Sequence, residues 1–154
     1  MAVGERIGFC VSGGLEAREI VDLAVLAESL GYESMWMAEG HGGDQFAILS
    51  ACATATRTIR LGTAISTVFV RTAPTIAMAA ATLANLSSGR FVLGLGSSHR
   101  VQVEAEHGVT YAKPITRVRE TVQVVRALLE TGSIEGFEGQ TLRVGEFAFW
   151  FENE

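Results

Sequence analysis

Apolar residues recur along the chain in two alternating patterns. Short apolar runs, typical of buried strands, begin near residues 6, 34, 59 and 91. Between them lie segments with apolar residues at three- and four-residue steps, as in Ile20 to Leu30, and this periodicity is typical of helices with one buried face. Strand starts that lie about 25 to 32 residues apart indicate strand-helix units of a parallel sheet. The pattern therefore predicts four such units.

Residues that begin or end helices bound these segments. Asp44 is placed to cap a helix from Gln45 to about Thr56, and Pro74 falls in the first turn of the next helix. Pro114 opens the longest helix, and Gly132 ends it. The buried face of that helix is expected to be Ile115, Val118, Val122, Val125 and Leu129, and its charged residues Arg117, Arg119, Glu120 and Arg126 are expected in solvent.

The length of 154 residues limits how these units close. A barrel of eight units needs about 250 residues, so we expect an α/β fold that is part of one. The expectation is a partial (β/α)8 TIM-type barrel of about four (β/α) units over residues 1–133, then a C-terminal β hairpin or strand over residues 134–154. An open doubly wound sheet is the alternative. In the barrel, the interior side chains are expected to be Phe9, Met35, Met37, Leu61, Thr63, Ile65, and Val92 or Leu93.

Composition and charge exclude several classes of protein. With 48% hydrophobic and 19% charged residues the chain is too apolar for disorder, and a net charge of -5 without a basic stripe argues against nucleic-acid binding. The apolar stretch Thr75 to Leu86 is too short to span a bilayer, and we expect neither a signal peptide nor a membrane partner. Cys10 and Cys52 lack metal-ligand spacing, so we expect buried thiols in a reducing cytoplasm and no metal site.

The loops that follow the strands carry the candidate chemistry, because parallel α/β sheets bind ligands at the carboxyl ends of their strands. Glu39, His41 and His99 are the loop residues suited to proton transfer near neutral pH. Each also has a plainer interpretation: Glu39 as a carboxylate that accepts a backbone N–H, and the histidines as solvated polar residues. The run from Gly94 to Ser98 is only a weak nucleotide motif, because it lacks the GxGxxG frame.

Five segments, taken together, carry a family resemblance. They are Ile20 to Tyr32 (IVDLAVLAESLGY), Met35 to Phe46 (MWMAEGHGGDQF), Thr58 to Arg71 (TIRLGTAISTVFVR), Ala80 to Ser98 (AATLANLSSGRFVLGLGSS) and His107 to Leu129 (HGVTYAKPITRVRETVQVVRALL). In this order and spacing the chain resembles the luciferase-like monooxygenase superfamily. The resemblance is greatest to the branch of reductases and dehydrogenases that use the deazaflavin coenzyme F-420, and it covers about residues 6 to 145.

The resemblance implies an eight-fold barrel with flavin mononucleotide (FMN) or coenzyme F-420 across the carboxyl ends of its strands. It implies that Glu39 faces the cofactor ring and that a non-prolyl cis peptide at Ala64-Ile65 supports the ring from behind. Further cofactor contacts are implied at Ser66, Gly96, Ser97, Ser98 and Gln102, and His99 stands where some relatives have an acid or base. Two departures are visible. Gly40 separates His41 from the strand-two acid, and the contacts supplied by the family's second barrel half have no counterpart in this sequence.

The resemblance implies an oxidoreductase that transfers hydride between an unidentified small molecule and coenzyme F-420 or FMN, in a form shorter than its relatives. The alternative is a non-catalytic half-barrel scaffold or cofactor-binding fragment that oligomerises. A homodimer is expected, because a cut barrel leaves open sheet edges and an uncovered apolar face. The aromatic residues Phe147, Phe149, Trp150 and Phe151 add to that apolar surface.

Overall fold

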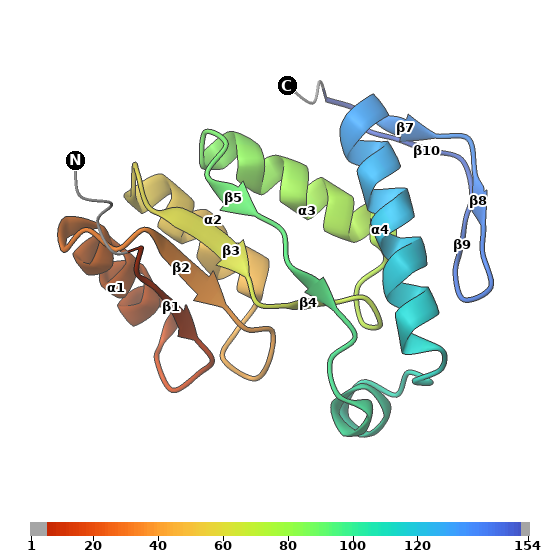
Figure 1. Cartoon of the computed structure of the whole chain (residues 1–154), viewed down its shortest axis with the longest axis horizontal. Helices are drawn as coiled ribbons and strands as arrows, with labels where there is room; N and C mark the ends of the chain where they lie inside the picture. The colour runs from red at the N-terminus through yellow and green to blue at the C-terminus, as the bar shows by residue number, and fades with distance from the viewer. Residues whose placement is uncertain (1–5, 152–154) are drawn as a thin grey trace. The chain divides into compact units, whose positions relative to one another are not determined.

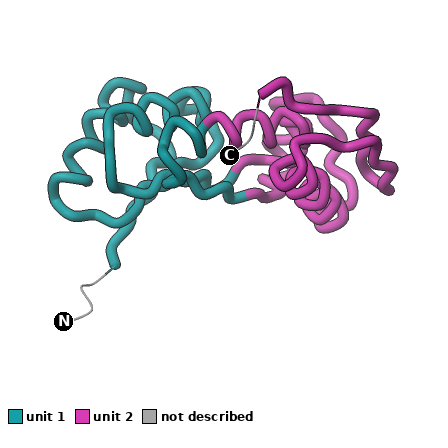
Figure 2. The backbone as a smooth tube through the Cα atoms, turned by 90° about the horizontal axis from the view of Figure 1, so that it is seen from above, with its two compact units in different colours: residues 1–65, 83–94 teal, residues 66–82, 95–154 magenta. Residues whose placement is uncertain are grey.

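The structure, a computed structural model, describes residues 6–151 and comprises two compact units, which Figure 2 shows in different colours. The first unit contains the residues up to Ile65 together with Leu83–Gly94. The second contains Ser66–Thr82 together with the residues from Leu95 onward. The domain boundary expected at residue 133 stays a prediction, and the outermost residues of the two predicted segments lie outside the described residues.

The first unit is built on a parallel sheet whose strands are connected through helices (Figure 1). In chain order its elements are β1 (Gly8–Val11), α1 (Ala17–Ser29), β2 (Ser34–Met37), α2 (Gln45–Ala55), β3 (Arg60–Thr63) and β5 (Phe91–Val92). The strands pair in the order β1-β2-β3-β5. The predicted alternation of strands and helices in a parallel sheet is therefore confirmed.

The second unit combines a short parallel pair, helices and a C-terminal antiparallel region (Figure 1). Its elements are β4 (Ser66–Thr67), α3 (Ala73–Leu86), β6 (Leu95–Gly96), a π-helix (Gln102–Glu106), α4 (Pro114–Thr131), β7 (Ser133–Ile134), β8 (Phe137–Glu138), β9 (Arg143–Val144) and β10 (Phe147–Ala148). Helix α3 contributes its last residues to the first unit. Strand β4 pairs with β6, β8 with β9, and β7 with β10. The two antiparallel pairs confirm the predicted β structure after the last helix.

Single residues fix the helix ends as the sequence predicts. The Asp44 carboxylate accepts the backbone N–H of Ala47 at 2.9 Å, which satisfies one of the unpaired donors at the start of α2. Pro114 lies in the first turn of α4, where a missing N–H costs nothing. Gly132 ends α4 with a φ of 74°, a left-handed conformation that glycine adopts most readily.

Two of the predicted strands are each divided in the structure. The run from Ile59 to Thr67 forms β3 and β4, with Ala64 and Ile65 between them, and the run from Phe91 to Leu95 forms β5 and β6. The division changes the pairing partners: β3 and β5 belong to the sheet of the first unit, whereas β4 and β6 pair with each other in the second. The chain therefore passes between the two units at each break.

Helices cover one face of the sheet in the first unit, because α1 and α2 lie on the same side of it (Figure 1). Met35 and Leu61 are paired neighbours and both are fully buried, and Met37 and Thr63, the next buried pair, are also neighbours. Since side chains alternate between the two faces of a strand, these residues face the helices. The expectation that they line a barrel interior is wrong: strand periodicity predicts the alternation but not which alternate set the helices cover.

The opposite face of this sheet carries a row of paired neighbours, Cys10, Trp36, Gly62 and Val92. The Trp36 ring lies against Gly62, where an added Cβ would stand 2.4 Å from two of the ring carbons. Cys10 and Val92 are exposed, so the expected burial of Cys10 is wrong. Cys52 is buried as expected, and this burial raises the pKa of its thiol to about 11.

Helix α4 buries a different face from the one that its apolar residues predict. Its buried residues are Glu120, Thr121, Val124, Val125 and Leu128, whereas Ile115 is 83% exposed. The Glu120 carboxylate accepts the backbone N–H groups of Gln140 and Thr141 at 2.8 and 2.9 Å. Arg117 is half-buried and donates to two backbone carbonyls, one of them that of Thr141. The expectation that Glu120 and Arg117 lie in solvent is therefore wrong.

The buried carboxylate of Glu120 gives the second unit a pH dependence. The Thr141 hydroxyl and the N–H groups of the same loop hold the pKa of Glu120 at about 2. Because an unfolded glutamate has a pKa of about 4.3, this stabilisation is present above that pH and is lost as the pH falls towards the folded value. We expect Glu120→Gln to lower the melting temperature at neutral pH and to weaken the loss of stability in acid. Thermal melts over the acid range measure both effects.

Glu130→Gln is the matched control for this experiment, because Glu130 lies on the exposed face of the same helix. We expect its melting temperature to follow that of the unmodified chain at every pH. An unchanged melt of Glu120→Gln would contradict the role assigned to the carboxylate.

Candidate functional site

The loop after β2 carries two of the predicted proton-transfer residues. Glu39 is half-buried, and His41 lies two residues further on in an exposed position. Gly43 has a φ of 101°, a conformation that favours glycine and that turns the chain towards the start of α2. The loop therefore places a carboxylate and an imidazole at the edge of the sheet where α/β folds bind ligands.

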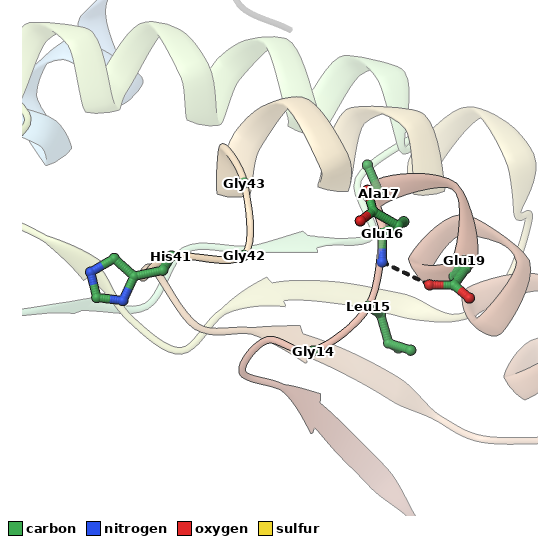
Figure 3. A pocket seen from close by; sticks show the side chains of 8 residues that line it. All are labelled: Gly14, Leu15, Glu16, Ala17, Glu19, His41, Gly42 and Gly43. Atoms are coloured by element: carbon green, nitrogen blue, oxygen red, sulfur yellow. Dashed lines mark hydrogen bonds between the residues drawn. The ribbon is translucent and has the colours of Figure 1, made fainter.

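A cavity of about 580 Å³ lies between this loop and the loop after β1 (Figure 3). His41, Gly42 and Gly43 line one part of it, and the start of α1 lines another. The Glu19 carboxylate accepts the backbone N–H of Glu16 at 2.8 Å, so this carboxylate caps α1. The volume suits a small molecule, and His41 is the lining side chain best suited to proton transfer.

The residues between β3 and β4 have the backbone form that the family resemblance implies. The peptide bond between Ala64 and Ile65 is cis. The N–H of Ala64 donates to the carbonyl of Met37 at 2.8 Å, which ties the end of β3 to the end of β2. The Thr63 hydroxyl donates to the carbonyl of Gly94 and accepts its N–H, both at 2.8 Å. A Cβ at Gly94 would lie 2.2 Å from the Thr63 carbonyl oxygen, so this close approach requires glycine.

The loop after β6 forms a hydrogen-bonded cluster that contains three of the predicted cofactor contacts. The Ser98 hydroxyl donates to the side-chain oxygen of Gln102 at 2.8 Å, and the Tyr111 hydroxyl donates to the Ser97 hydroxyl at 3.0 Å. Tyr111 in turn stacks on Phe69 with ring centroids 4.7 Å apart. The turn is tight, since Ser98 has a φ of 57° and the π-helix begins at Gln102. We call Ser97, Ser98, Gln102 and Tyr111 the serine-loop cluster.

The other predicted site residues of the second unit lie beside this cluster in the sequence. Ser66 is buried in β4, and Gly96 pairs in β6 opposite Thr67. His99 is exposed, and its backbone carbonyl accepts the N–H of Val103. Within residues 6–151, no three His, Cys, Asp or Glu side chains are grouped as metal ligands, and no helix is long and apolar enough to cross a membrane.

Sequence reasoning missed two residues that hold these loops through hydrogen bonds. Tyr111 lies in a polar segment where no periodicity or spacing marks it, and its partner Ser98 is 13 residues away. Gln45 is completely buried, and its side-chain nitrogen donates to the carbonyls of Met37 and Ile65. A polar residue on the buried face of a predicted helix is a signal that could have found Gln45.

Comparison with known proteins assigns the chain to a family. The profile of luciferase-like monooxygenases matches residues 5–154. The chain belongs to this family. A protein of Mycobacterium tuberculosis, named provisionally as a coenzyme F-420-dependent oxidoreductase, is 36% identical over 126 residues, which are 82% of this chain and 36% of that protein.

Two further proteins are similar to the chain. The 5,10-methylenetetrahydromethanopterin reductase of Archaeoglobus fulgidus is 31% identical over 77% of this chain and 35% of its own length. The crystal structure of a monooxygenase from Streptomyces bottropensis is 28% identical, with a TM-score of 0.76 over 84% of this chain and 41% of that one. Solved structures that resemble the chain are TIM-type barrels of luciferase-like enzymes, so its fold is part of such a barrel. The chain spans about a third of the length of these curated relatives.

Removing the hydroxyl of Tyr111 tests whether the serine-loop cluster orders the loop after β6. In Tyr111→Phe the stack on Phe69 is kept and only the hydrogen bonds to the loop are lost. We expect faster amide hydrogen exchange in residues 97–102, because local opening is easier when the loop loses these bonds. Exchange measured by mass spectrometry should change little elsewhere.

Tyr32→Phe is the control for that experiment, since Tyr32 packs edge-on against Phe9 in the first unit. Exchange in residues 97–102 should be the same in this variant as in the unmodified chain. Equal exchange in Tyr111→Phe would show that the hydroxyl does not hold the loop.

Proposed function

We propose that the chain supplies part of the active site of an oxidoreductase that moves hydride between a small molecule and coenzyme F-420 or FMN. The observation that carries the proposal is the serine-loop cluster at the carboxyl end of β6. Its hydroxyl and amide groups are uncharged donors and acceptors, which fit the polar edge of a flavin-type ring and the hydroxyls of its side chain. Membership of the family supports the same assignment.

The residues of the chain would hold the cofactor and handle protons. Ser97, Ser98 and Gln102, with the neighbouring Ser66 and Gly96, would hold it, and Ala64 and Ile65 would support its ring. When bound, the ring of either cofactor gives or accepts the hydride. Glu39 would supply a carboxylate to the cofactor ring. His99 would act as acid or base towards the substrate, with His41 at the cavity as the second candidate.

Coenzyme F-420 is the preferred cofactor, and FMN is the alternative. The preference is supported by the Mycobacterium tuberculosis relative, which carries this coenzyme in its name. It is also supported by the segments Ala38 to Gly42 and Leu93 to Ser98, which resemble that branch of the family. We place the protein in the cytoplasm, where the reduced thiols expected for Cys10 and Cys52 persist.

The second candidate function is a half-barrel scaffold or cofactor-binding fragment without catalysis, which oligomerises. It is favoured by Cys10 and Val92, which are exposed on the face of the first unit's sheet that α1 and α2 leave uncovered. Fluorescence titration of the purified chain with coenzyme F-420 and with FMN tests both candidates. Binding with hydride transfer to or from a substrate supports the oxidoreductase, and binding without transfer supports the fragment.

Substitution of the proposed proton-handling residues tests their roles. We expect Glu39→Gln and His99→Ala each to lower hydride transfer by about a hundredfold or more, because general acid-base groups contribute about 10²- to 10⁴-fold. His107→Ala is the control, since His107 is exposed and is assigned no role. If all three substitutions lower the rate of hydride transfer only slightly and equally in a steady-state or single-turnover assay, the proposed proton-transfer roles are contradicted.

The exposed apolar surfaces predict that the chain forms a homodimer. Val92 on the sheet of the first unit is 38% exposed, and Trp150 and Phe151 near the C-terminus are 101% and 47% exposed. Large exposed apolar patches are unusual on a stable monomer, so each of these two surfaces is a candidate for the interface. We expect sedimentation at micromolar concentration to give a dimer and the melting temperature to rise with protein concentration.

Val92→Lys should shift this equilibrium towards monomer, because a lysine in the interface would have to lose its water. Leu26→Lys is the control, as Leu26 is 53% exposed on α1, away from the open face of the sheet. A monomeric unmodified chain with a concentration-independent melt would contradict the predicted pairing.

A further inference from the structure

We propose that Gln45 is a positioning residue, which fixes the loop that carries Glu39 and His41 and links that loop to Ile65. The inference rests on the proposed function, in which Glu39, His41 and Ile65 would face the cofactor. Gln45 is the first residue of α2, and its side chain is completely buried. Burial of an amide costs free energy unless its polar atoms are hydrogen-bonded, so the contacts of this group show what it provides.

The side-chain nitrogen of Gln45 contacts the end of β2 and the segment between β3 and β4. It donates to the carbonyl of Met37, the last residue of β2, at 2.5 Å, and it lies 3.4 Å from the carbonyl of Ile65. The Met37 carbonyl also accepts the N–H of Ala64. One amide group therefore links Met37, at the end of β2, to Ile65, which follows β3.

The bond to Met37 also closes the loop after β2 at its base. Gln45 is eight residues beyond Met37, and Glu39 and His41 both lie between them. Asp44, the residue before Gln45, caps α2 and fixes where the helix starts. The direction of the Gln45 side chain is thus set by the helix, and the loop is held between two fixed points.

The side-chain oxygen of Gln45 indicates that the hydrogen bonds to Met37 and Ile65 are kept although the buried amide destabilises the fold. This oxygen is buried and has no hydrogen-bond partner among residues 6–151. A buried acceptor without a partner is destabilising, and an apolar side chain of similar length would avoid it. What the apolar side chain could not provide is the donor that joins Met37 to Ile65. The amide therefore serves the placement of the loop rather than the packing of the core.

Gln45→Met tests the proposal, because methionine keeps the length of the side chain and removes the donor. We expect the variant to bind coenzyme F-420 or FMN about tenfold more weakly, the effect of losing roughly one net hydrogen bond from the positioned state. Fluorescence titration measures this affinity, and thermal melts measure stability in parallel. Amide exchange in residues 38–44 should become faster.

Thr56→Val is the matched control, as Thr56 is a buried polar residue at the other end of α2. Its hydroxyl donates to the Cys52 carbonyl at 2.7 Å, so the variant also loses a buried hydrogen bond. We expect a lower melting temperature with less than a twofold change in cofactor affinity.

Gln45→Glu provides a rescue that depends on pH. Its carboxylate cannot donate to the two carbonyls, whereas its protonated form has one O–H that can. We expect its cofactor affinity to rise towards that of the unmodified chain as the pH falls, with no such rise for Gln45→Met.

The outcomes separate this inference from the proposed function. If the unmodified chain binds a cofactor and Gln45→Met binds it equally well, the positioning role is overturned and the proposed function stands. The role is also overturned if Gln45→Met and Thr56→Val lose affinity alike, because the loss then follows stability. If the unmodified chain binds neither cofactor, the proposed function fails and the positioning role falls with it.

Discussion

Burial of one row of side chains against α1 and α2 is the constraint on which the first unit depends. Met35 and Leu61 face one another across the register of β2 and β3, and both are fully buried. Since the side-chain period of a strand is two, this choice also decides that Trp36 and Gly62 face the other way. A slip of one residue would bring Trp36 against the helices and expose the methionines. The same register places the ends of β2 and β3 side by side, where Glu39 and Ala64 follow.

Two loops of the chain are anchored by carboxylates that accept several backbone N–H groups. Glu28, near the end of α1, accepts the backbone N–H groups of Arg57, Thr58 and Ile59 ahead of β3. Burial opposes its charge, but these N–H groups outweigh burial and hold the pKa of Glu28 at about 2. Glu120 plays the same part for a loop of the second unit. A carboxylate that accepts several N–H groups thus fixes the backbone of a turn through its main-chain donors.

The sequence predicts the features that single residues or local periodicity decide. Asp44, Pro114 and Gly132 fix helix ends through one hydrogen bond, a missing N–H and a left-handed φ, and all three stand where they were expected. Two features that depend on residues far apart in the chain were predicted wrongly. The buried face of α4 shifted because Glu120 binds a loop some 20 residues away. The face of the sheet that the helices cover was also reversed, since both sets of alternate residues in β2 contain large side chains.

The residues of the candidate site also differ in whether the sequence predicts them. Glu39, His41 and the serines after β6 could be named from the sequence, because strand ends of a parallel sheet are predictable from spacing and the family resemblance covers them. Tyr111 could not, since its role arises only when its hydroxyl meets Ser97. Gln45 lies between these cases: its helix was predicted, and an amide at a position that the helix buries requires a partner. That partner is the strand end eight residues earlier, so the polar residue carries information about the loop that the apolar pattern lacks.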